Sequence, residues 1–208
     1  MITIIDYGLG NIQAFLNVYN QLHISAKVAR SMGDLDDATK LILPGVGHFD
    51  YAMQRFNDSG MRPKVESLVL EENIPILGVC AGMQIMAEAS EEGIQPGLGW
   101  IGGMVKRLDQ TARPNNDLAL PHMGWNNVTP NHRELFNGID SDASEFYFLH
   151  SYYFECSSHK NCIGTTNYGS KFCSVVNKKN IFGVQFHPEK SHYYGISLLN
   201  NFAGLTLC

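Results

Sequence analysis

The stretch Pro75–Ala89, PILGVCAGMQIMAEA, decides how the rest of the chain is interpreted. An apolar run leads into Cys80, and an amphipathic segment follows. Gly78 and Gly82 stand two residues before and after Cys80, so the stretch reads glycine–x–nucleophile–x–glycine between a strand and a helix. Such an elbow exposes its nucleophile on a strained turn, and the glycines let strand and helix pass without Cβ clashes. The alternative is a small buried core cysteine.

Around this elbow, apolar runs alternate with helix-like segments. The predicted strands are continuous apolar runs, as strands buried on both faces require, and they cover Ile2–Ile5, Ala26–Ala29, Lys40–Gly45 and Ile74–Val79. The predicted helices cover Asn11–Leu22, Tyr51–Glu72 with a break near Gly60, Gly82–Ser90 and Tyr193–Ala203. The alternation predicts an α/β fold with a mostly parallel central sheet and flanking helices.

The second half of the chain has a different pattern. Between Gly97 and Phe186, short segments rich in aromatic and β-branched residues alternate with turn residues, which indicates hairpins and an antiparallel extension of the sheet. These segments are GLGWIGGMVKRL (97–108), EFYFLHSYYFEC (145–156) and CSVVNKKNIFGVQF (173–186), with a turn at Asn177–Asn180. The chain has no repeats or linkers, so we expect one domain over residues 1–208.

Composition excludes several classes of protein. The chain has 208 residues, 44% hydrophobic and 17% charged, which is typical of a well-packed soluble domain. A net charge of -5 disfavours a nucleic-acid groove. The N-terminus lacks a basic region and Asp6 interrupts its apolar run, so we expect no signal peptide, and no run approaches the roughly 18 residues of a membrane helix. The odd number and irregular spacing of the cysteines indicate free thiols in a reducing, cytoplasmic compartment: Cys80, Cys156, Cys162, Cys173 and Cys208.

A second motif, GVQFHPEKS at Gly183–Ser191, can supply a base for the elbow. Pro188 favours an extended conformation at His187. Since residues two apart in an extended chain point the same way, Glu189 can lie beside His187 and hold its tautomer. His187 could then deprotonate Cys80, giving a Cys–His–Glu triad. The alternative is an exposed loop with incidental charges.

Metal and nucleotide sites are disfavoured. His187, Glu189 and His192 form H-x-E-x-x-H, but a zinc deaminase also needs P-C-x-x-C, and C-x-x-C occurs nowhere in the chain. The segment Asp6–Asn11, DYGLGN, begins like G-x-G-x-x-G, yet Gln13 occupies the third glycine position. We therefore expect no metal and no cofactor.

A third motif, LPGVGHFDYAM at Leu43–Met53, follows a predicted strand. Its glycines can present amides to an anion, so beside the elbow the loop could complete an oxyanion hole with Gly47 as the contributor. A plain turn is the alternative. His122 and His150 are by default structural histidines with satisfied hydrogen bonds.

Together, the cysteine elbow, the glycine loop and the late His-Pro-Glu resemble the class I glutamine amidotransferase family over essentially the whole chain, and the elbow continues GMQ as the family's G-x-C-x-G-x-Q does. The resemblance implies that the Cys80 thiolate attacks the carboxamide of L-glutamine and that His187, oriented by Glu189, moves the protons. It further implies an oxyanion hole at Gly47 and Ala81, and substrate contacts at Gln84, His150, Ser151 and Tyr152.

Other blocks of sequence, including IIDYGLGN and PHMGWN, resemble the branch whose glutaminase subunit passes ammonia to a (βα)8-barrel cyclase of histidine biosynthesis. This resemblance implies a heterodimer with an ammonia channel and a movable glycine loop at Gly45–Gly47. It also assigns Asn11, Trp125 and Lys190 to the partner interface, although an aromatic such as Trp125 is core as often as interface.

Three alternatives remain open. GLGW at Gly97–Trp100 and EKSHYYG at Glu189–Gly195 look closer to a paralogous branch that serves sugar amidotransferases in surface-polysaccharide pathways. The chain could also be another cysteine-elbow hydrolase, or a binding subunit without activity, although Cys80, His187 and Glu189 are intact.

Overall fold

The computed structural model describes residues 1–109, 111, 118–140 and 144–206. The first half alternates strands and helices: β1 (Ile2–Ile5), α1 (Ile12–Gln21), β2 (Ala26–Ala29), β3 (Lys40–Gly45), α2 (Phe49–Asp58), α3 (Arg62–Glu66), β4 (Ile76–Cys80), α4 (Ala81–Gln84) and β5 (Ala89–Ser90). The second half consists of β6 (Gly103–Arg107), β7 (His122–Asn127), β8 (Thr129–Pro130), β9 (Glu145–His150), β10 (Tyr152–Cys156), β11 (Cys162–Tyr168), β12 (Ser170–Lys178), β13 (Ile181–Val184) and α5 (His192–Gly204).

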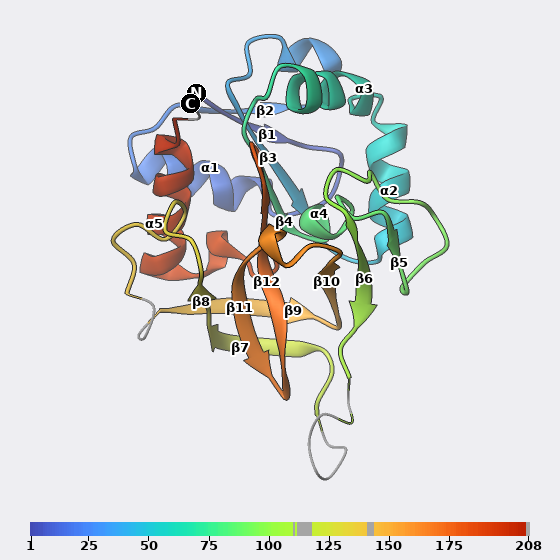
Figure 1. Ribbon diagram of the computed structural model, residues 1–208. Coiled ribbons are helices and arrows are strands. Elements are labelled where there is room, and N and C mark those ends of the chain that lie inside the picture. Colours follow the sequence, from blue (N-terminus) through green and yellow to red (C-terminus); the bar gives the residue numbers. More distant parts are fainter. Residues whose placement is uncertain (110, 112–117, 141–143, 207–208) are drawn as a thin grey trace.

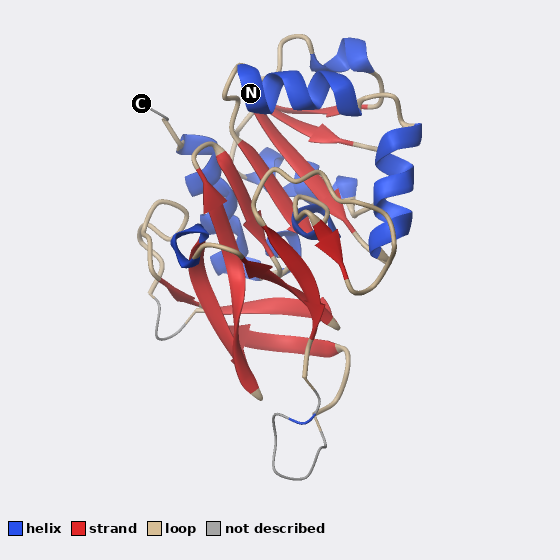
Figure 2. Ribbon diagram, turned by 45° about the vertical axis from the view of Figure 1, so that its right-hand side comes forward, coloured by secondary structure: helices blue, strands red, loops and turns tan. Residues whose placement is uncertain are grey.

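Within the described residues, an eight-stranded sheet in the order β2-β1-β3-β4-β13-β12-β11-β8 forms the centre of the molecule (Figure 2). The strands from β2 to β13 in that order are parallel, and β12, β11 and β8 extend the sheet antiparallel. The predicted α/β fold is therefore confirmed, as is the hairpin turn between β12 and β13, where Lys179 has a φ of 57°.

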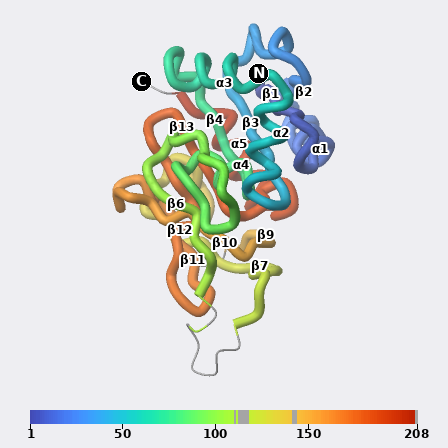
Figure 3. The backbone as a smooth tube through the Cα atoms, turned by 90° about the vertical axis from the view of Figure 1, so that its right-hand side faces the viewer, coloured from blue at the N-terminus to red at the C-terminus, as the bar shows by residue number. Residues whose placement is uncertain are grey.

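Helices cover both faces of the central sheet, with α1 and α5 on one side and α2 and α3 on the other (Figure 1). Neighbouring strand residues alternate between the two cores: Ile4 and Ile42 pack on the α1 side, and Ile5 and Leu43 on the α2 side. Because both faces are buried, these strands are apolar at consecutive positions rather than at every second one. The helices gather at the end of the molecule where the chain begins, and β7 and β9 lie at the opposite end (Figure 3).

Two smaller sheets, β10-β6-β5 and β7-β9, flank the central one. The segment 145–156, one of those from which hairpins were expected, forms two strands that pair antiparallel with different partners: β9 pairs with β7, and β10 pairs with β6. The reason is that Phe146 and Phe148 join the core on the α1 side whereas Phe154 joins the core on the α2 side. The chain thus crosses from one face of the central sheet to the other at Ser151.

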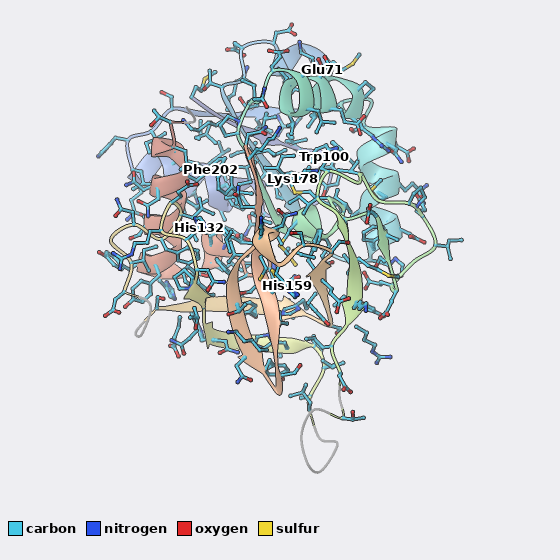
Figure 4. The ribbon with its side chains drawn as sticks, in the orientation of Figure 1. Glu71, Trp100, His132, His159, Lys178 and Phe202 are labelled. Carbon is cyan, nitrogen blue, oxygen red and sulfur yellow. The ribbon has the colours of Figure 1, made fainter. Side chains whose placement is uncertain are left out.

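The helix predicted over Gly82–Ser90 is also wrong, because α4 ends at Gln84. The carbonyl groups of the next three residues accept hydrogen bonds from the loop 97–101 instead of continuing the helix, at 2.8 Å (Leu98 N to Ile85 O), 3.1 Å (Ile101 N to Met86 O) and 2.9 Å (Gly99 N to Ala87 O). Residues 81–87 are all buried, so the segment is not amphipathic. The same loop is tied to β12, because Lys178 Nζ donates to the Trp100 carbonyl at 2.7 Å (Figure 4).

The glycines of the elbow lie where main chains touch. A Cβ on Gly82 would lie 2.0 Å from the Leu43 carbonyl oxygen of β3, and one on Gly45 would lie 2.1 Å from the Gly82 nitrogen. A Cβ on Gly78 would lie 2.8 Å from the Gly82 carbonyl oxygen. The predicted need for glycine on both sides of Cys80 is confirmed, and the neighbouring strand β3 contributes as much to it as β4.

This packing predicts that Gly82→Ala lowers the free energy of unfolding by about 3 kcal/mol or more, because the new methyl group meets backbone that cannot rotate away. Urea denaturation followed by circular dichroism measures the change. Gly33→Ala is the matched control, since a Cβ there meets nothing within 4 Å. Equal unfolding midpoints for the two variants would contradict the explanation.

Candidate active site

Cys80 stands at the junction of β4 and α4 with φ 54° and ψ -116°, in a region that residues other than glycine rarely occupy. It lies opposite Gly45 in the register of β3 and β4, at the carboxyl ends of the parallel strands. Ligand crevices of open α/β sheets lie at this edge. The predicted strained elbow is therefore present, and because such strain clusters at active sites, Cys80 is a candidate nucleophile.

A pocket of about 430 Å³ opens above the cysteine, a volume suited to a ligand of amino-acid size. It brings together eight residues that the sequence nominated from four separate stretches: Gly47, Cys80, Gln84, His150, Ser151, Tyr152, His187 and Lys190. Ala81 is buried beneath it, where its side chain adjoins Gly45. Gly47 has a φ of 86°, a conformation that suits glycine.

His187 follows the end of β13 and enters the same pocket. Its Nδ1 lies 2.9 Å from Glu189 Oε1, and the two side chains are 3% and 2% exposed. Burial lowers the pKa of His187, but hydrogen bonds to Cys80 and Glu189 and the charges of both outweigh it and raise the pKa to about 10. His187 is therefore an imidazolium at neutral pH, with the Cys80 side chain as one of its hydrogen-bond partners.

His192, the last residue of the H-x-E-x-x-H pattern, lies away from this pair. Its ring stacks on Trp125 with the centroids 5.1 Å apart. Among the residues that the structure describes, no group of three or more His, Cys, Asp or Glu side chains could hold a metal ion.

Gln84 joins α4 to the far wall of the pocket. Its Nε2 donates to the Tyr152 carbonyl at 3.0 Å and to Gln185 Oε1 at 3.1 Å. Gln185 Nε2 in turn lies 3.8 Å from Cys80 Sγ. Gln185 was not predicted from the sequence, although its position two residues before His187 on an extended segment places both side chains on one side of the chain.

His122 and His150 form a one-way chain of hydrogen bonds that ends at the pocket. Asn126 Nδ2 donates to His122 Nε2 at 3.1 Å, so His122 carries its proton on Nδ1 and donates to His150 Nε2 at 3.0 Å. His150 Nδ1 then donates to the Tyr152 carbonyl at 2.8 Å. Each histidine is thus held as a single tautomer, and the prediction that both have satisfied hydrogen bonds is confirmed.

Both histidines of this chain are neutral at physiological pH. Burial lowers the pKa of His122 to about 4. Burial, together with the charges of His122 and His187, lowers the pKa of His150 to about 3. The pocket therefore has a protonated histidine on one side of Cys80 and a neutral pair on the other.

The residues nominated for a partner interface lie outside the core. Asn11 is exposed and caps α1, with its Oδ1 accepting from the Ala14 amide at 3.2 Å. Trp125 is 45% exposed, so it is not a core aromatic. Its ring centroid lies 5.9 Å from that of Tyr147, and Lys190 Nζ lies 5.8 Å from the same Tyr147 ring. Trp125 and Lys190 thus share a neighbour near the pocket rim.

A model of the family glutamine amidotransferase class-I matches residues 3–204. The chain belongs to this family. The amidotransferase is 52% identical to imidazole glycerol phosphate synthase subunit HisH of Bdellovibrio bacteriovorus, over 98% of this chain and 99% of the relative. It is 47% identical to the subunit of the same name from Leptospira interrogans, over 99% of this chain and 100% of the relative.

Solved structures agree with the amidotransferase fold. A crystal structure described as a glutamine amidotransferase has a TM-score of 0.74 at 19% identity, covering 98% of this chain and 99% of the other. A chain in the structure of PurLQS from Thermotoga maritima has a TM-score of 0.71 at 16% identity, covering 98% of this chain and 97% of the other. In the part of the chain that the structure describes, no helix has the length and apolarity needed to cross a bilayer.

The charge on His187 predicts how Cys80 reacts with iodoacetamide. At pH 7 we expect the Cys80 peptide of the wild type to be alkylated at least severalfold faster than that of His187→Gln, because the imidazolium beside the sulfur persists to about pH 10 and a neighbouring cation makes a cysteine more reactive. Mass spectrometry of the peptide measures both rates, with His159→Gln as a surface control; equal rates for wild type and His187→Gln would refute the role of the charge.

The neutral histidine pair predicts a loss of stability in acid. The unfolded chain protonates both groups near pH 6.5 but the folded chain only near pH 4 and 3, so the unfolding free energy falls as pH drops through this window. The loss is on the order of 3 kcal/mol per histidine. Urea unfolding between pH 7 and 4 measures it, and a double variant with His122→Gln and His150→Gln has a flatter profile. A double variant whose profile is as steep as that of the surface control His159→Gln would contradict this assignment.

Proposed function

We propose that this chain is the glutaminase subunit of an imidazole glycerol phosphate synthase, which hydrolyses L-glutamine to glutamate and ammonia. The ammonia passes to a (βα)8-barrel cyclase, which makes imidazole glycerol phosphate and aminoimidazole carboxamide ribotide in histidine biosynthesis. The observation that carries the proposal is the pocket with Cys80 on its strained elbow beside the His187–Glu189 pair, in a chain similar over its full length to HisH subunits.

In the first half-reaction, the Cys80 thiolate attacks the carboxamide carbon of glutamine. The carbonyl oxygen becomes an oxyanion, which the amides of Gly47 and Ala81 stabilise. His187 gives its proton to the departing nitrogen, so ammonia leaves and a thioester remains on Cys80. The second half-reaction reverses the roles: neutral His187 takes a proton from water, hydroxide attacks the thioester, and glutamate leaves with the thiolate restored.

Glu189 holds His187 in the orientation that both steps require, with Nδ1 engaged and Nε2 free to face the sulfur. The wall formed by Gln84, His150, Ser151 and Tyr152 binds the rest of the glutamine. Free ammonia would be protonated at neutral pH, so a partner must cover the pocket and receive it. The exposed residues Asn11, Trp125 and Lys190 form part of the surface that meets this partner. A thiolate nucleophile and free cysteines fit a reducing cytoplasm.

Glutamine turnover with defined partners tests the proposal. We expect slow glutamate release by the chain alone and strong stimulation by the cyclase subunit of the same organism when the cyclase substrate is present. A sugar amidotransferase from the same organism is the comparison arm. If only that partner stimulated turnover, the assignment to histidine biosynthesis would be wrong while the triad stood.

The triad itself predicts that Cys80→Ala lowers kcat by at least about 10⁴-fold and that Glu189→Gln lowers it by about 10²- to 10⁴-fold, in each case with the fold intact. Cys162→Ala is the matched control, because this thiol lies outside the pocket and its loss is expected to change kcat less than about twofold. Glutamate release in the stimulated complex measures all three, and an active Cys80→Ala variant would overturn the mechanism.

A further inference from the structure

Three further cysteines, none of which lines the pocket, meet where β10, β11 and β12 adjoin. Cys156 ends β10, Cys162 begins β11 and Cys173 lies within β12. The Sγ atoms of Cys156 and Cys173 are 4.0 Å apart, and Cys162 is near enough to Cys173 for each to influence the pKa of the other. All three are free thiols; Cys173 is 9% exposed, and the other two are partly exposed. Their spacing in the chain is irregular, so only the fold brings them together.

The thiols of this cluster differ in pKa. A hydrogen bond from Cys173, assisted by the charge of Lys171, lowers the pKa of Cys162. Hydrogen bonds to Cys156 and to Cys162, together with burial, raise the pKa of Cys173 well above its ordinary value. A partly exposed thiol beside a second thiol that can resolve it is the arrangement found at redox-sensitive cysteines.

We propose that Cys156 and Cys173 form a dithiol redox site, which a low-molecular-weight disulfide such as glutathione disulfide converts to an intramolecular disulfide. Their sulfur atoms are already in contact and need to approach by about 2 Å to reach the length of an S–S bond. This proposal is independent of the function proposed above, because it involves none of the pocket residues.

The reaction balances in two thiol–disulfide exchanges. Cys156 loses its proton, attacks one sulfur of the small disulfide and expels the other half as a thiolate. Cys173 then attacks the Cys156 sulfur of the mixed disulfide and expels the second small thiolate, which takes up the proton that Cys173 loses. The two protons end on the two small thiols, so one protein dithiol is oxidised and one small disulfide is reduced.

The new bond would join two sheets, since β10 belongs to β10-β6-β5 and β12 belongs to the central sheet. The first residue of β10 is Tyr152, whose carbonyl accepts from both Gln84 and His150. The redox site therefore lies at one end of a strand whose other end forms a wall of the pocket.

The test uses the full chain with Cys80→Ser and Cys208→Ser, so that only the cluster can react. After equilibration with mixtures of reduced and oxidised glutathione, we expect the loss of two of the three remaining thiols, a Cys156–Cys173 linked peptide in non-reducing mass spectrometry, and recovery of both thiols with dithiothreitol. Adding Cys156→Ser abolishes the linked peptide, whereas adding Cys162→Ser keeps it.

Three outcomes would overturn the proposal: three persisting thiols, glutathione adducts without a linked peptide, or a linked peptide that contains Cys162 in place of Cys156. Because the linked peptide is sought in the chain with the cluster intact, a variant that failed to fold would not decide the result.

Discussion

The contact between the backbones of β3, β4 and α4 is the constraint on which the rest of this molecule depends. At Gly45, Gly78 and Gly82 the main chains approach so closely that no Cβ fits. This packing holds Cys80 in its strained conformation and leaves its sulfur at the carboxyl edge of the sheet. Every other part of the pocket is arranged around that fixed atom.

Three histidines in and behind the pocket differ in charge: His187 is protonated, whereas His122 and His150 are neutral. His187 gains hydrogen bonds and negative neighbours and keeps its proton. His122 and His150 are buried, and the charge of His187 further opposes a proton on His150, so both lose theirs. A protonated His150 would place a second positive charge near the Cys80 sulfur. It would also interrupt the chain of hydrogen bonds that ends at the Tyr152 carbonyl. Because neither His122 nor His150 has a carboxylate partner, burial keeps both neutral. His187 remains the charged histidine of the pocket, and proton transfer requires this difference.

Features with a local cause were predicted from the sequence, and features decided by distant contacts were not. The strand-turn pattern at Cys80 and the spacing of His187 and Glu189 depend on neighbouring residues, so both were found. The length of the helix that contains Gln84 was overestimated, because amides of the loop 97–101 donate to the carbonyl groups that would otherwise continue it. The break at Ser151 was missed because alternating residues do not reveal which core each strand joins. Gln185 lies within GVQFHPEKS, but nothing local distinguishes it from its neighbours, and the cluster of Cys156, Cys162 and Cys173 has no sequence motif.

At Ser151 the chain passes from one hydrophobic core to the other, and we call this point the seam. On one side of it, β9 is embedded in the core beneath α1 and α5; on the other, β10 is embedded in the core beneath α2. The residues at the seam line the pocket, so a ligand bound there touches both cores at once. Trp125 lies on β7, the hydrogen-bonded neighbour of β9. The last two residues of β9, Leu149 and His150, line the pocket, so the strand that pairs with β7 ends beside the nucleophile.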